Sequence, residues 1–348
     1  MKKPTLCVIF GGKSNEYYVS LHSAYGVITH INQEKYNLVC VGITKKGQWY
    51  LFEGGCEEIA NDTWQKGRVT PVTLDLSQGH LIVLDKSIYA IDVDLFFPVM
   101  HGEFVEDGRI QGLFDMAGVK YVGCDSFASH ICMDKALTKD VARKMGIEVA
   151  KDVVVNAKFK TQINDATKTR DGWDFGYPVF VKPCMCGSSV GVSRAENEGE
   201  LEKALELSLR YCDRVLIEEA IDGYEAEVAV METKEGLLVS SVGMIKHKST
   251  FYDYFAKYKS DNVEYLIPAP ITNEESEYIR ECAKQLFYGL GCRGLSRFDF
   301  FVKKSGGIVF NEVNTMPGFT EISMFPKLFM NMGYSYEEIV DFLIRSAL

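Results

Sequence analysis

Apolar residues follow two different spacings in the first third of the chain, and each spacing predicts one kind of element. Leu6–Phe10 is a short unbroken apolar run, which favours a buried strand. After it, apolar residues recur every three or four positions, as on one face of a helix, at Leu21, Ala24, Ile28 and Ile31. Two further runs, Leu38–Thr44 and Asp94–Met100, predict strands again. This alternation predicts a βαβ lobe with a parallel sheet, whose strands end at Gly11-Gly12 and His101-Gly102.

Beyond residue 125 the elements change order. A helix capped by Asp125 or Ser126 is expected to run to Gly146. The later predicted elements are strand Pro178–Lys182, helix Gly199–Cys212, strands Val215–Ile221, Ala226–Thr233 and Leu237–Ile245, helix Asn273–Gly291, a hairpin, and two helical segments ending with Tyr336–Leu348. The chain is therefore predicted to form a Rossmann-like α/β lobe over residues 1–125 and two α+β lobes over residues 126–213 and 214–348.

The most informative pattern is the hairpin, in which two apolar-rich strands flank the turn Ser305-Gly306. Pairing about that turn places Asp299 opposite Glu312. Arg297 then lies opposite Asn314, and all four side chains project from one face because side chains alternate along a strand. Two carboxylates and an amide oxygen are ligands that Mg²⁺ prefers, and a neighbouring arginine suits a phosphate. A plain surface hairpin with a salt bridge is the alternative.

Two segments in the middle of the chain point to a nucleotide only in combination. Lys182 ends a predicted strand, and backbone N–H groups in the small-residue turn Cys186–Gly191 can bind an anion. A plain hairpin turn fits the same residues. Glu218 and Glu225 lie on the next strand and its exit, where they suit an adenine amine and ribose hydroxyls. Solvated strand charges are the alternative for these two residues.

An aromatic segment, residues 250–258, has the composition of a loop that closes over an active site, since such a loop needs apolar surface and a charge. Lys257 suits a phosphate and Tyr258 suits a substrate or another lobe. A loop packed on the surface by its aromatic rings is the alternative. Gly318 follows the hairpin, where its backbone can approach a reacting carbonyl and its N–H can serve as an oxyanion donor.

Composition narrows the classes of protein. The 348 residues are 47% hydrophobic and 25% charged, as in an ordinary globular protein. The net charge of −10 argues against nucleic acid as the main partner, and no apolar run is long enough to span a membrane. The ten cysteines, without a signal peptide, predict reduced thiols and a cytoplasmic protein.

Seven motifs occur in the order typical of one family. They are Phe10–Glu16 with Val19–Leu21, His101–Gly108, Cys132–Lys135, Lys182-Pro183 with Gly187–Gly191, Tyr252–Tyr258, Arg297–Asp299, and Asn311–Thr320. Over essentially its whole length the chain resembles the D-alanine–D-alanine ligases of the ATP-grasp superfamily. The resemblance implies a Rossmann-like N-terminal lobe followed by a two-lobed ATP-grasp α+β domain. It also implies that a D-alanine carboxylate attacks ATP to give an acylphosphate, which the amine of a second D-amino acid converts to the dipeptide used in peptidoglycan.

The resemblance further implies roles for single residues. The residues matching ATP contacts are Lys135, Lys182, Glu218, Glu225 and Lys257. The residues matching ligands of Mg²⁺, as two ions with Mn²⁺ as an alternative, are Asp299, Glu312 and Asn314. The residues matching the catalytic group are Arg297 and Gly318, which would stabilise a tetrahedral intermediate, and the hydrogen-bonded trio Glu16, Ser188 and Tyr258. The residues matching substrate contacts are His101, Tyr252, Ser323 and Met324.

The chain departs from the family pattern at three places. Val105 stands where the family usually has glycine, and a β-branched residue does not readily adopt positive φ. Tyr17-Tyr18 follows Glu16 where at least one polar or charged residue is usual, and Glu321-Ile322 precedes Ser323 where small or polar residues are usual. These departures concern the substrate contacts rather than the ATP site.

The second substrate is predicted to be D-alanine, because D-serine ligases of the vancomycin-resistance type tend to have phenylalanine in place of Tyr252 and arginine in place of Met324. Segments such as Gly42–Tyr50 and Val122–Asp125 nevertheless resemble those resistance ligases. A D-alanine–D-serine ligase, another ATP-grasp ligase and a non-catalytic nucleotide-binding regulator therefore stay open. A homodimer is expected by resemblance.

Overall fold

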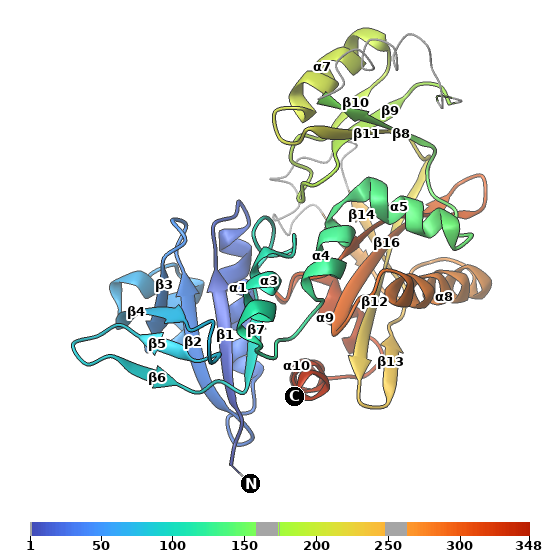
Figure 1. Cartoon of the computed structure of the whole chain (residues 1–348). Helices are drawn as coiled ribbons and strands as arrows, with labels where there is room; N and C mark the ends of the chain where they lie inside the picture. The colour runs from blue at the N-terminus through green and yellow to red at the C-terminus, as the bar shows by residue number, and fades with distance from the viewer. Residues whose placement is uncertain (1, 158–172, 174, 248–262) are drawn as a thin grey trace.

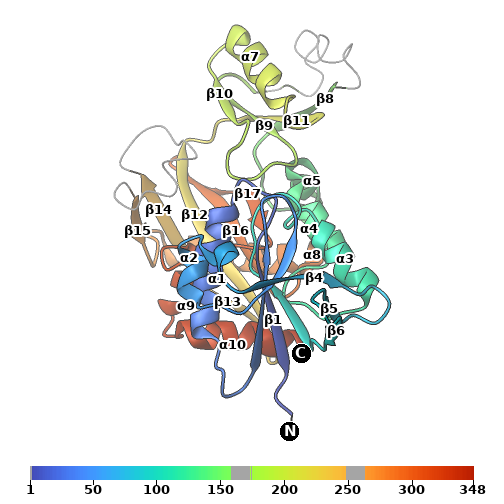
Figure 2. The ribbon, with the colours of Figure 1, turned by 90° about the vertical axis from the view of Figure 1, so that its left-hand side faces the viewer.

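The computed structural model describes residues 2–157, 173, 175–247 and 263–348. These residues form three sheets, each with helices packed against it. Figure 1 shows the N-terminal lobe beside the C-terminal lobe, with the central sheet and its helix α7 above the C-terminal lobe. Figure 2, turned by 90°, shows the central sheet and α7 again at one end of the molecule. Within the described residues, no helix has both the length and the apolar character needed to cross a bilayer.

The N-terminal lobe is a mixed sheet with the strand order β6-β5-β4-β3-β2-β1-β7. Its parallel part consists of β1 (Thr5–Gly11), β2 (Asn37–Ile43) and β7 (Leu95–Pro98). Antiparallel pairs extend it through β3 (Trp49–Phe52), β4 (Val69–Leu74), β5 (Leu81–Val83) and β6 (Tyr89–Ile91). The predicted parallel pairing is therefore limited to β2, β1 and β7. The chain leaves β2 through a tight turn, and such a turn can join only antiparallel strands.

The carboxyl ends of β1 and β7, where the predicted site residues begin, lie at one edge of this sheet. Helix α1 (Tyr17–His30) buries Leu21, Ala24 and Ile28 against β1, as the spacing predicts. The lobe also contains α2 (Cys56–Ala60), the 3₁₀ turn η1 (Trp64–Lys66) and α3 (Arg109–Ala117). Because β1 and β7 are neighbouring parallel strands, Gly11-Gly12 and His101-Gly102 leave the sheet side by side.

The helix predicted over residues 126–146 is two helices, so that prediction is wrong in its continuity. Helix α4 (Ser126–Met133) ends at Asp134, whose extended ψ of 102° breaks the helix. The Asp134 carboxylate then accepts hydrogen bonds from the N–H groups of Ala136 and Leu137, which caps α5 (Lys135–Lys144). Because the helix is interrupted at Asp134, Lys135 begins α5 next to the central sheet. Its backbone N–H donates to the carbonyl of Cys184 there.

The central sheet is antiparallel with the order β10-β9-β11-β8. Its strands are β8 (Asp152–Asn156), β9 (Val179–Pro183), β10 (Ser193–Ala195) and β11 (Arg214–Glu219). Helix α7 (Glu198–Ser208) covers one face, where it packs on Val179, Val181, Val215 and Ile217. Alternation directs Phe180, Lys182, Leu216 and Glu218 to the other face, and Leu216 packs there against Ala136 of α5.

The C-terminal sheet has the order β15-β14-β12-β16-β17, and β13 pairs with β12 off this path. Its strands are β12 (Gly223–Thr233), β13 (Gly236–Val239), β14 (Gly243–His247), β15 (Val263–Leu266), β16 (Leu295–Lys303) and β17 (Ile308–Asn314). Its helices are α8 (Asn273–Gly289), α9 (Met324–Met330) and α10 (Tyr336–Ala347). The single strand predicted over Leu237–Ile245 is split between β13 and β14, because the register against β12 shifts by one residue between the pair Val230–Val239 and the pair Glu227–Gly243.

Shared hydrophobic clusters hold the lobes together. One cluster joins Leu21 of α1 with Phe325 of α9 and Leu343 of α10. Another joins Cys132 of α4 and Ala142 of α5 with the C-terminal sheet and α8. The division of the chain at residues 125 and 213 stays a prediction.

Candidate active site

The hairpin of β16 and β17 forms the floor of the candidate site. Its strands pair Asp299 with Glu312 and Arg297 with Asn314, as the sequence predicts. On the other side of β16, strand β12 pairs Glu227 with Asp299. Three carboxylates therefore lie in one row across three strands, at Glu227, Asp299 and Glu312.

The predicted two-residue turn of this hairpin is wrong. The loop spans residues 304–306, since the N–H of Lys303 bonds to the carbonyl of Gly307 at 3.0 Å. Near this loop Phe300 pairs with Phe310, one position out of step with the Asp299–Glu312 pair. A β-bulge at Asn311 absorbs the extra residue and restores the predicted register. The bulge therefore aims Glu312 at the face that carries Asp299.

Arg297 is held by two carboxylates. Its Nε and Nη2 donate to Asp299 Oδ1 and Oδ2 at 2.8 and 2.7 Å, and its Nε lies 2.9 Å from Glu227 Oε2. The Asn314 amide donates to Asp299 Oδ2 at 3.0 Å. Burial raises the pKa of Asp299, with Glu312 acting in the same direction and Arg297 opposing it. The pKa of Arg297 lies well above its ordinary value, because the carboxylates outweigh the effect of burial.

This row fits a divalent cation by the chemistry of its donors. Carboxylate and amide oxygens are hard ligands, and a cation relieves the repulsion between Asp299 and Glu312 that raises the pKa of Asp299. The candidate set of Asp299, Glu312 and Asn314 contains two acids and one amide. Among the residues that the structure describes, no three His, Cys, Asp or Glu side chains form a metal-binding group by themselves.

Two predicted phosphate contacts lie close to this row. Lys135 Nζ lies 3.7 Å from Glu312 Oε2 and donates to the carbonyl of Cys186 at 2.7 Å. Lys182 Nζ lies 3.5 Å from Asn311 Oδ1 and forms an ion pair with Glu218. The structure therefore brings Lys135 and Lys182 together with the carboxylates of the hairpin.

The predicted adenine and ribose contacts differ in burial. Glu218 is almost completely buried, and its second oxygen lies 3.0 Å from Lys139 Nζ. Burial alone would raise its pKa, but Lys139 and Lys182 lower the pKa of Glu218 to about 2. Glu225 is exposed on β12, two residues before Glu227 and therefore on the same face.

Glu16 and Ser188 meet between the N-terminal and central lobes, since the Ser188 hydroxyl donates to Glu16 Oε1. Ser188 and Ser189 have φ angles of 52° and 57°, in the left-handed region. The turn that contains them joins the antiparallel strands β9 and β10, so it is a hairpin connection. Glu16 is positioned by Ser14, whose oxygen accepts the N–H of Glu16 at 3.0 Å and whose hydroxyl donates to the carbonyl of His101 at 2.6 Å.

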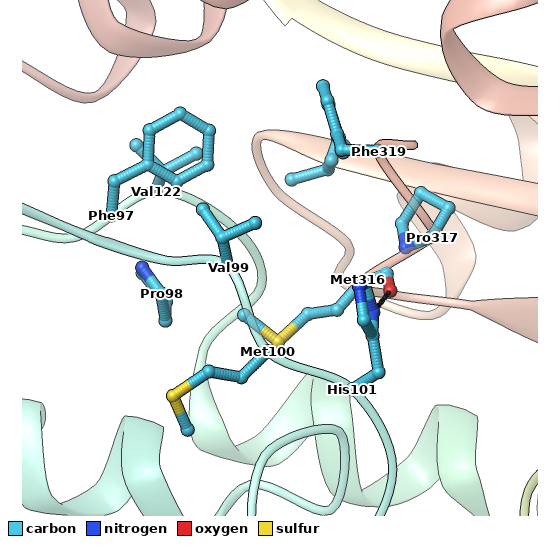
Figure 3. Close-up of a pocket in the computed structure, with 10 residues that line it drawn as sticks. Phe97, Pro98, Val99, Met100, His101, Val122, Met316, Pro317 and Phe319 are labelled. Carbon is cyan, nitrogen blue, oxygen red and sulfur yellow. Dashed lines mark hydrogen bonds between the residues drawn. The ribbon is translucent and has the colours of Figure 1, made fainter. Parts of the chain in front are cut away.

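His101 holds the segment that follows the hairpin. Its Nδ1 lies 2.9 Å from the carbonyl oxygen of Met316 (Figure 3). Its Nε2 lies 2.9 Å from Ser23 Oγ. A carbonyl only accepts, so Nδ1 carries the proton and Nε2 accepts from Ser23. Ser23 Oγ in turn accepts the N–H of Phe319 at 3.1 Å. Burial lowers the pKa of His101, which favours this neutral form.

Glu106 is a site residue to which the sequence assigned no role, although it lies inside the motif His101–Gly108. Its Oε1 lies 3.9 Å from His101 Nδ1, and its side chain is 14% exposed. Burial and the negative charge of Glu16 raise the pKa of Glu106 to about 8. This shift favours the protonated form of the Glu106 carboxyl group near neutral pH.

Two family models match the chain and together cover nearly all of it. The model described as "D-ala D-ala ligase N-terminus" matches residues 5–124, and the model described as "D-ala D-ala ligase C-terminus" matches residues 141–345. The chain belongs to the D-alanine–D-alanine ligase family. This is a family of ATP-dependent ligases with the ATP-grasp fold, so the predicted Rossmann-like lobe followed by a two-lobed ATP-grasp domain is confirmed.

Relatives of this family match over nearly their whole length. The chain is 41% identical over 349 residues to D-alanine–D-alanine ligase B of Clostridium tetani, covering 100% of this chain and 94% of that protein. It is 42% identical over 362 residues to the D-alanine–D-alanine ligase of Ruminiclostridium cellulolyticum, covering 100% and 96%.

Solved structures of two ligases are also similar. The VanG D-Ala:D-Ser ligase from Enterococcus faecalis superposes with a TM-score of 0.91 at 37% identity, covering 100% of both chains. The D-alanine–D-alanine ligase from Coxiella burnetii superposes with a TM-score of 0.84 at 30% identity, covering 99% of this chain and 95% of that one.

Packing absorbs two of the departures from the ligase family pattern. Val105 is fully buried, and the non-glycine residue with positive φ in its loop is the preceding Phe104, at 69°. Tyr17 is also buried, and its hydroxyl donates to Asp62 at 2.9 Å while accepting from Trp64 Nε1. Tyr18 lies on the surface with Lys45 Nζ 3.8 Å from the centre of its ring.

Predicted substrate contacts near α9 differ in accessibility. Ser323 Oγ accepts the N–H of Thr320 at 3.0 Å and closes the turn before the helix. A Cβ on Gly318 would lie 2.6 Å from Ser323 Oγ, so a larger residue at this position would displace the Ser323 hydroxyl. Met324 is 3% exposed and packs beside Gly243 in the hydrophobic core. The remaining predicted residues, Tyr252, Lys257 and Tyr258, lie outside the described part of the chain.

Proposed function

We propose that this protein is a D-alanine–D-alanine ligase, which uses ATP to join the carboxyl group of one D-alanine to the amino group of another. One observation carries the proposal. The Arg297–Asp299 pair lies in register with Glu312, and Lys135 reaches to 3.7 Å from that same glutamate. A metal-suited carboxylate pair, an arginine and a phosphate-suited lysine thus share one face, as activation of a carboxylate by ATP requires.

The phosphoryl-transfer step needs positive charge and alignment more than covalent help from the protein. Lys135 and Lys182 would neutralise the ATP phosphates, and Lys257, outside the described residues, would hold the transferred phosphate. Asp299, Glu312 and Asn314 would hold Mg²⁺, as two ions with Mn²⁺ as an alternative, which supplies charge neutralisation at the phosphates. Glu218 and Glu225 would accept hydrogen bonds from the adenine amine and the ribose hydroxyls, respectively.

The acyl-transfer step develops negative charge on the carbonyl oxygen of the first D-alanine. Arg297 is suited to stabilise it, because Asp299 and Glu227 fix the plane of its guanidinium group before the reaction. The N–H of Gly318 would be the second donor. A donor fixed in advance costs no reorganisation at the moment of reaction.

The first D-alanine would bind beside Glu16, whose carboxylate suits an ammonium group. Ser188 supports Glu16, and Tyr258 would complete the trio, although it lies outside the described residues. The second substrate would lie near His101 and Ser323, with Tyr252 and Met324 shaping its pocket. Because Met324 is nearly buried, its effect on the second substrate would be through packing rather than through an exposed contact.

A second candidate, a D-alanine–D-serine ligase, is supported by the similarity to the VanG D-Ala:D-Ser ligase at a TM-score of 0.91. The two candidates differ only in the second substrate. A site without a partner for the serine hydroxyl disfavours D-serine by about 1–3 kcal/mol, or roughly ten- to a hundredfold. In this chain Met324 stands where the resistance-type D-serine ligases tend to have an arginine. A second D-alanine is therefore the proposed substrate, and the dipeptide would serve peptidoglycan synthesis.

The experiment supplies ATP, Mg²⁺ and equal concentrations of D-alanine, D-serine and D-lactate, and resolves the products by mass. D-alanyl-D-alanine is expected to dominate. Dominant D-alanyl-D-serine would select the second candidate. ATP binding without phosphate release or any dipeptide would instead favour a non-catalytic nucleotide-binding regulator.

The family resemblance also supports a homodimer that acts in the cytoplasm, with small-molecule substrates and without nucleic-acid or membrane partners. Sedimentation velocity at micromolar concentration tests the dimer. A species of 39.2 kDa would be the monomer.

A further inference from the structure

A completely buried ion pair contains Glu218, the predicted adenine contact. Lys139 Nζ on α5 lies 3.0 Å from Glu218 Oε2 on β11, and the two side chains are 2% and 3% exposed. Lys182, from the neighbouring strand β9, forms an ion pair with the other oxygen of Glu218. One carboxylate thus lies between two lysines, of which only Lys182 belongs to the predicted ATP contacts.

The two lysines differ in what else they can reach. Lys182 is 12% exposed, and its Nζ also lies 3.5 Å from Asn311 Oδ1, beside the carboxylate row of the hairpin. Lys139 forms its ion pair with Glu218, and its charge also acts on Asp152, which faces Glu218 across the β8–β11 pair. Lys182 is therefore placed to turn from Glu218 toward a phosphate, whereas Lys139 stays with Glu218.

Such a turn would leave a buried carboxylate without a counter-ion if Lys139 were absent. A buried carboxylate that loses its ion-pair partner is strongly disfavoured, because the protein interior does not replace the lost solvation. Glu218 would then take up a proton or draw Lys182 back from the phosphate. Either outcome weakens nucleotide binding.

We propose that Lys139 is a positioning residue for ATP binding, a permanent counter-ion that keeps Glu218 charged and in place while Lys182 serves the phosphates. This inference rests on the proposed ATP site and names a residue beyond it. The low pKa of Glu218, about 2, agrees with two cations acting on this one carboxylate.

A purely structural role for Lys139 would be to attach α5 to the central sheet, and the chain offers a matched control for that role. Arg143 lies one helical turn further along α5 and forms an ion pair with Asp152 of β8. Asp152 faces Glu218 directly across the β8–β11 pair. Arg143→Met therefore removes the neighbouring link between α5 and the sheet without removing a partner of Glu218.

The test measures Mg²⁺-ATP binding by calorimetry in the absence of D-alanine, together with steady-state kinetics. Lys139→Met is expected to weaken ATP binding at least tenfold and to raise KM for ATP, with kcat changed less than threefold. Lys139→Arg and Arg143→Met are expected to bind ATP within threefold of the unsubstituted protein. In a Glu218→Gln background, where no carboxylate needs a counter-ion, Lys139→Met is expected to have less than a threefold effect.

Equal loss of ATP affinity in both backgrounds, or no loss in Lys139→Met, would overturn the inference. If Lys139→Met does not fold, Lys139→Gln replaces it with the same expectations. Dipeptide formation by the unsubstituted protein is measured alongside. Its absence would count against the proposed function, whereas normal dipeptide formation with an unaffected Lys139→Met variant would overturn only the role of Lys139.

Discussion

The Ser188 hydroxyl donates a hydrogen bond to the carboxylate of Glu16, and this contact joins the central lobe to the N-terminal lobe. The two residues are 172 positions apart in the chain. Ser188 has a left-handed backbone conformation, which residues other than glycine rarely adopt unless the surrounding structure stabilises it. The lobe contact and the proposed site for the first D-alanine therefore depend on the same hydrogen bond.

Ser188→Ala is expected to raise KM for D-alanine about tenfold or more, because a hydrogen bond to a charged group contributes about 1.5–3 kcal/mol. Substrate titration at saturating ATP measures the effect. Ser189→Ala is the matched control, since Ser189 has a similar φ and is expected to leave KM within a factor of about two. Equal effects of the two substitutions would show that the turn, rather than the Glu16 contact, is responsible.

Glu312→Gln is expected to lower ATP turnover by roughly a hundredfold or more, because the amide keeps the shape but loses the charge that a divalent cation needs. Stability should change by less than about 1 kcal/mol, since the Glu312 side chain is 30% exposed. Phosphate release and urea unfolding measure the two effects, with the exposed Glu235→Gln as control. Near-normal turnover would remove Glu312 from the metal ligands.

His101 is expected to lower the free energy of unfolding at acidic pH. Burial lowers its pKa below the ordinary 6.5, so the unfolded chain binds this proton more readily than the folded protein. The contribution is present above about pH 6.5 and is lost as the pH falls below it. The free energy of unfolding should therefore decline less between pH 6.5 and about 5 in His101→Asn than in the unsubstituted protein. Parallel pH profiles of the two proteins would contradict this account of His101.

Glu106 has the opposite pH dependence. Its pKa of about 8 exceeds the ordinary 4.5, so the folded protein holds a proton that the unfolded chain releases. Burial and the charges of Glu16 and Glu312 raise this pKa, and Arg297 opposes the rise. The free energy of unfolding should therefore fall as the pH rises from 4.5 toward 8. Glu106→Gln should remove this part of the slope in urea unfolding without Mg²⁺. An unchanged slope would place the proton elsewhere.

The register of the hairpin shows why the sequence predicts some of the site correctly. Side chains alternate along each strand, and strand pairing places Asp299 opposite Glu312. The apolar pattern of the two strands encodes that pairing. The predicted two-residue turn is wrong, because the loop has three residues. The bulge at Asn311 shifts the register back by one residue, so the predicted pair of Asp299 with Glu312 still forms. A bulge inserts one extra residue into one strand of the pair, and no fixed spacing of apolar residues marks where it occurs.

Other features depend on contacts between distant segments and were not predicted. The pairs of Glu227 with Arg297 and of Lys139 with Glu218 each join separate elements. A single acid or lysine within an apolar pattern does not reveal its partner. The antiparallel strands β3 to β6 were also not predicted, because each is short and the stretch lacks a sustained alternation. The break at Asp134 carried a visible signal, since aspartate is a preferred N-cap.

The most direct test of the account follows the oxygen atoms of D-alanine. The protein is incubated with ATP, Mg²⁺ and D-alanine that carries ¹⁸O in its carboxyl group, and the inorganic phosphate is analysed by mass. If the carboxylate attacks the γ-phosphate, each dipeptide formed should leave one ¹⁸O atom in the released phosphate. Dipeptide formation with unlabelled phosphate, or phosphate release without dipeptide, would contradict the proposed ligase.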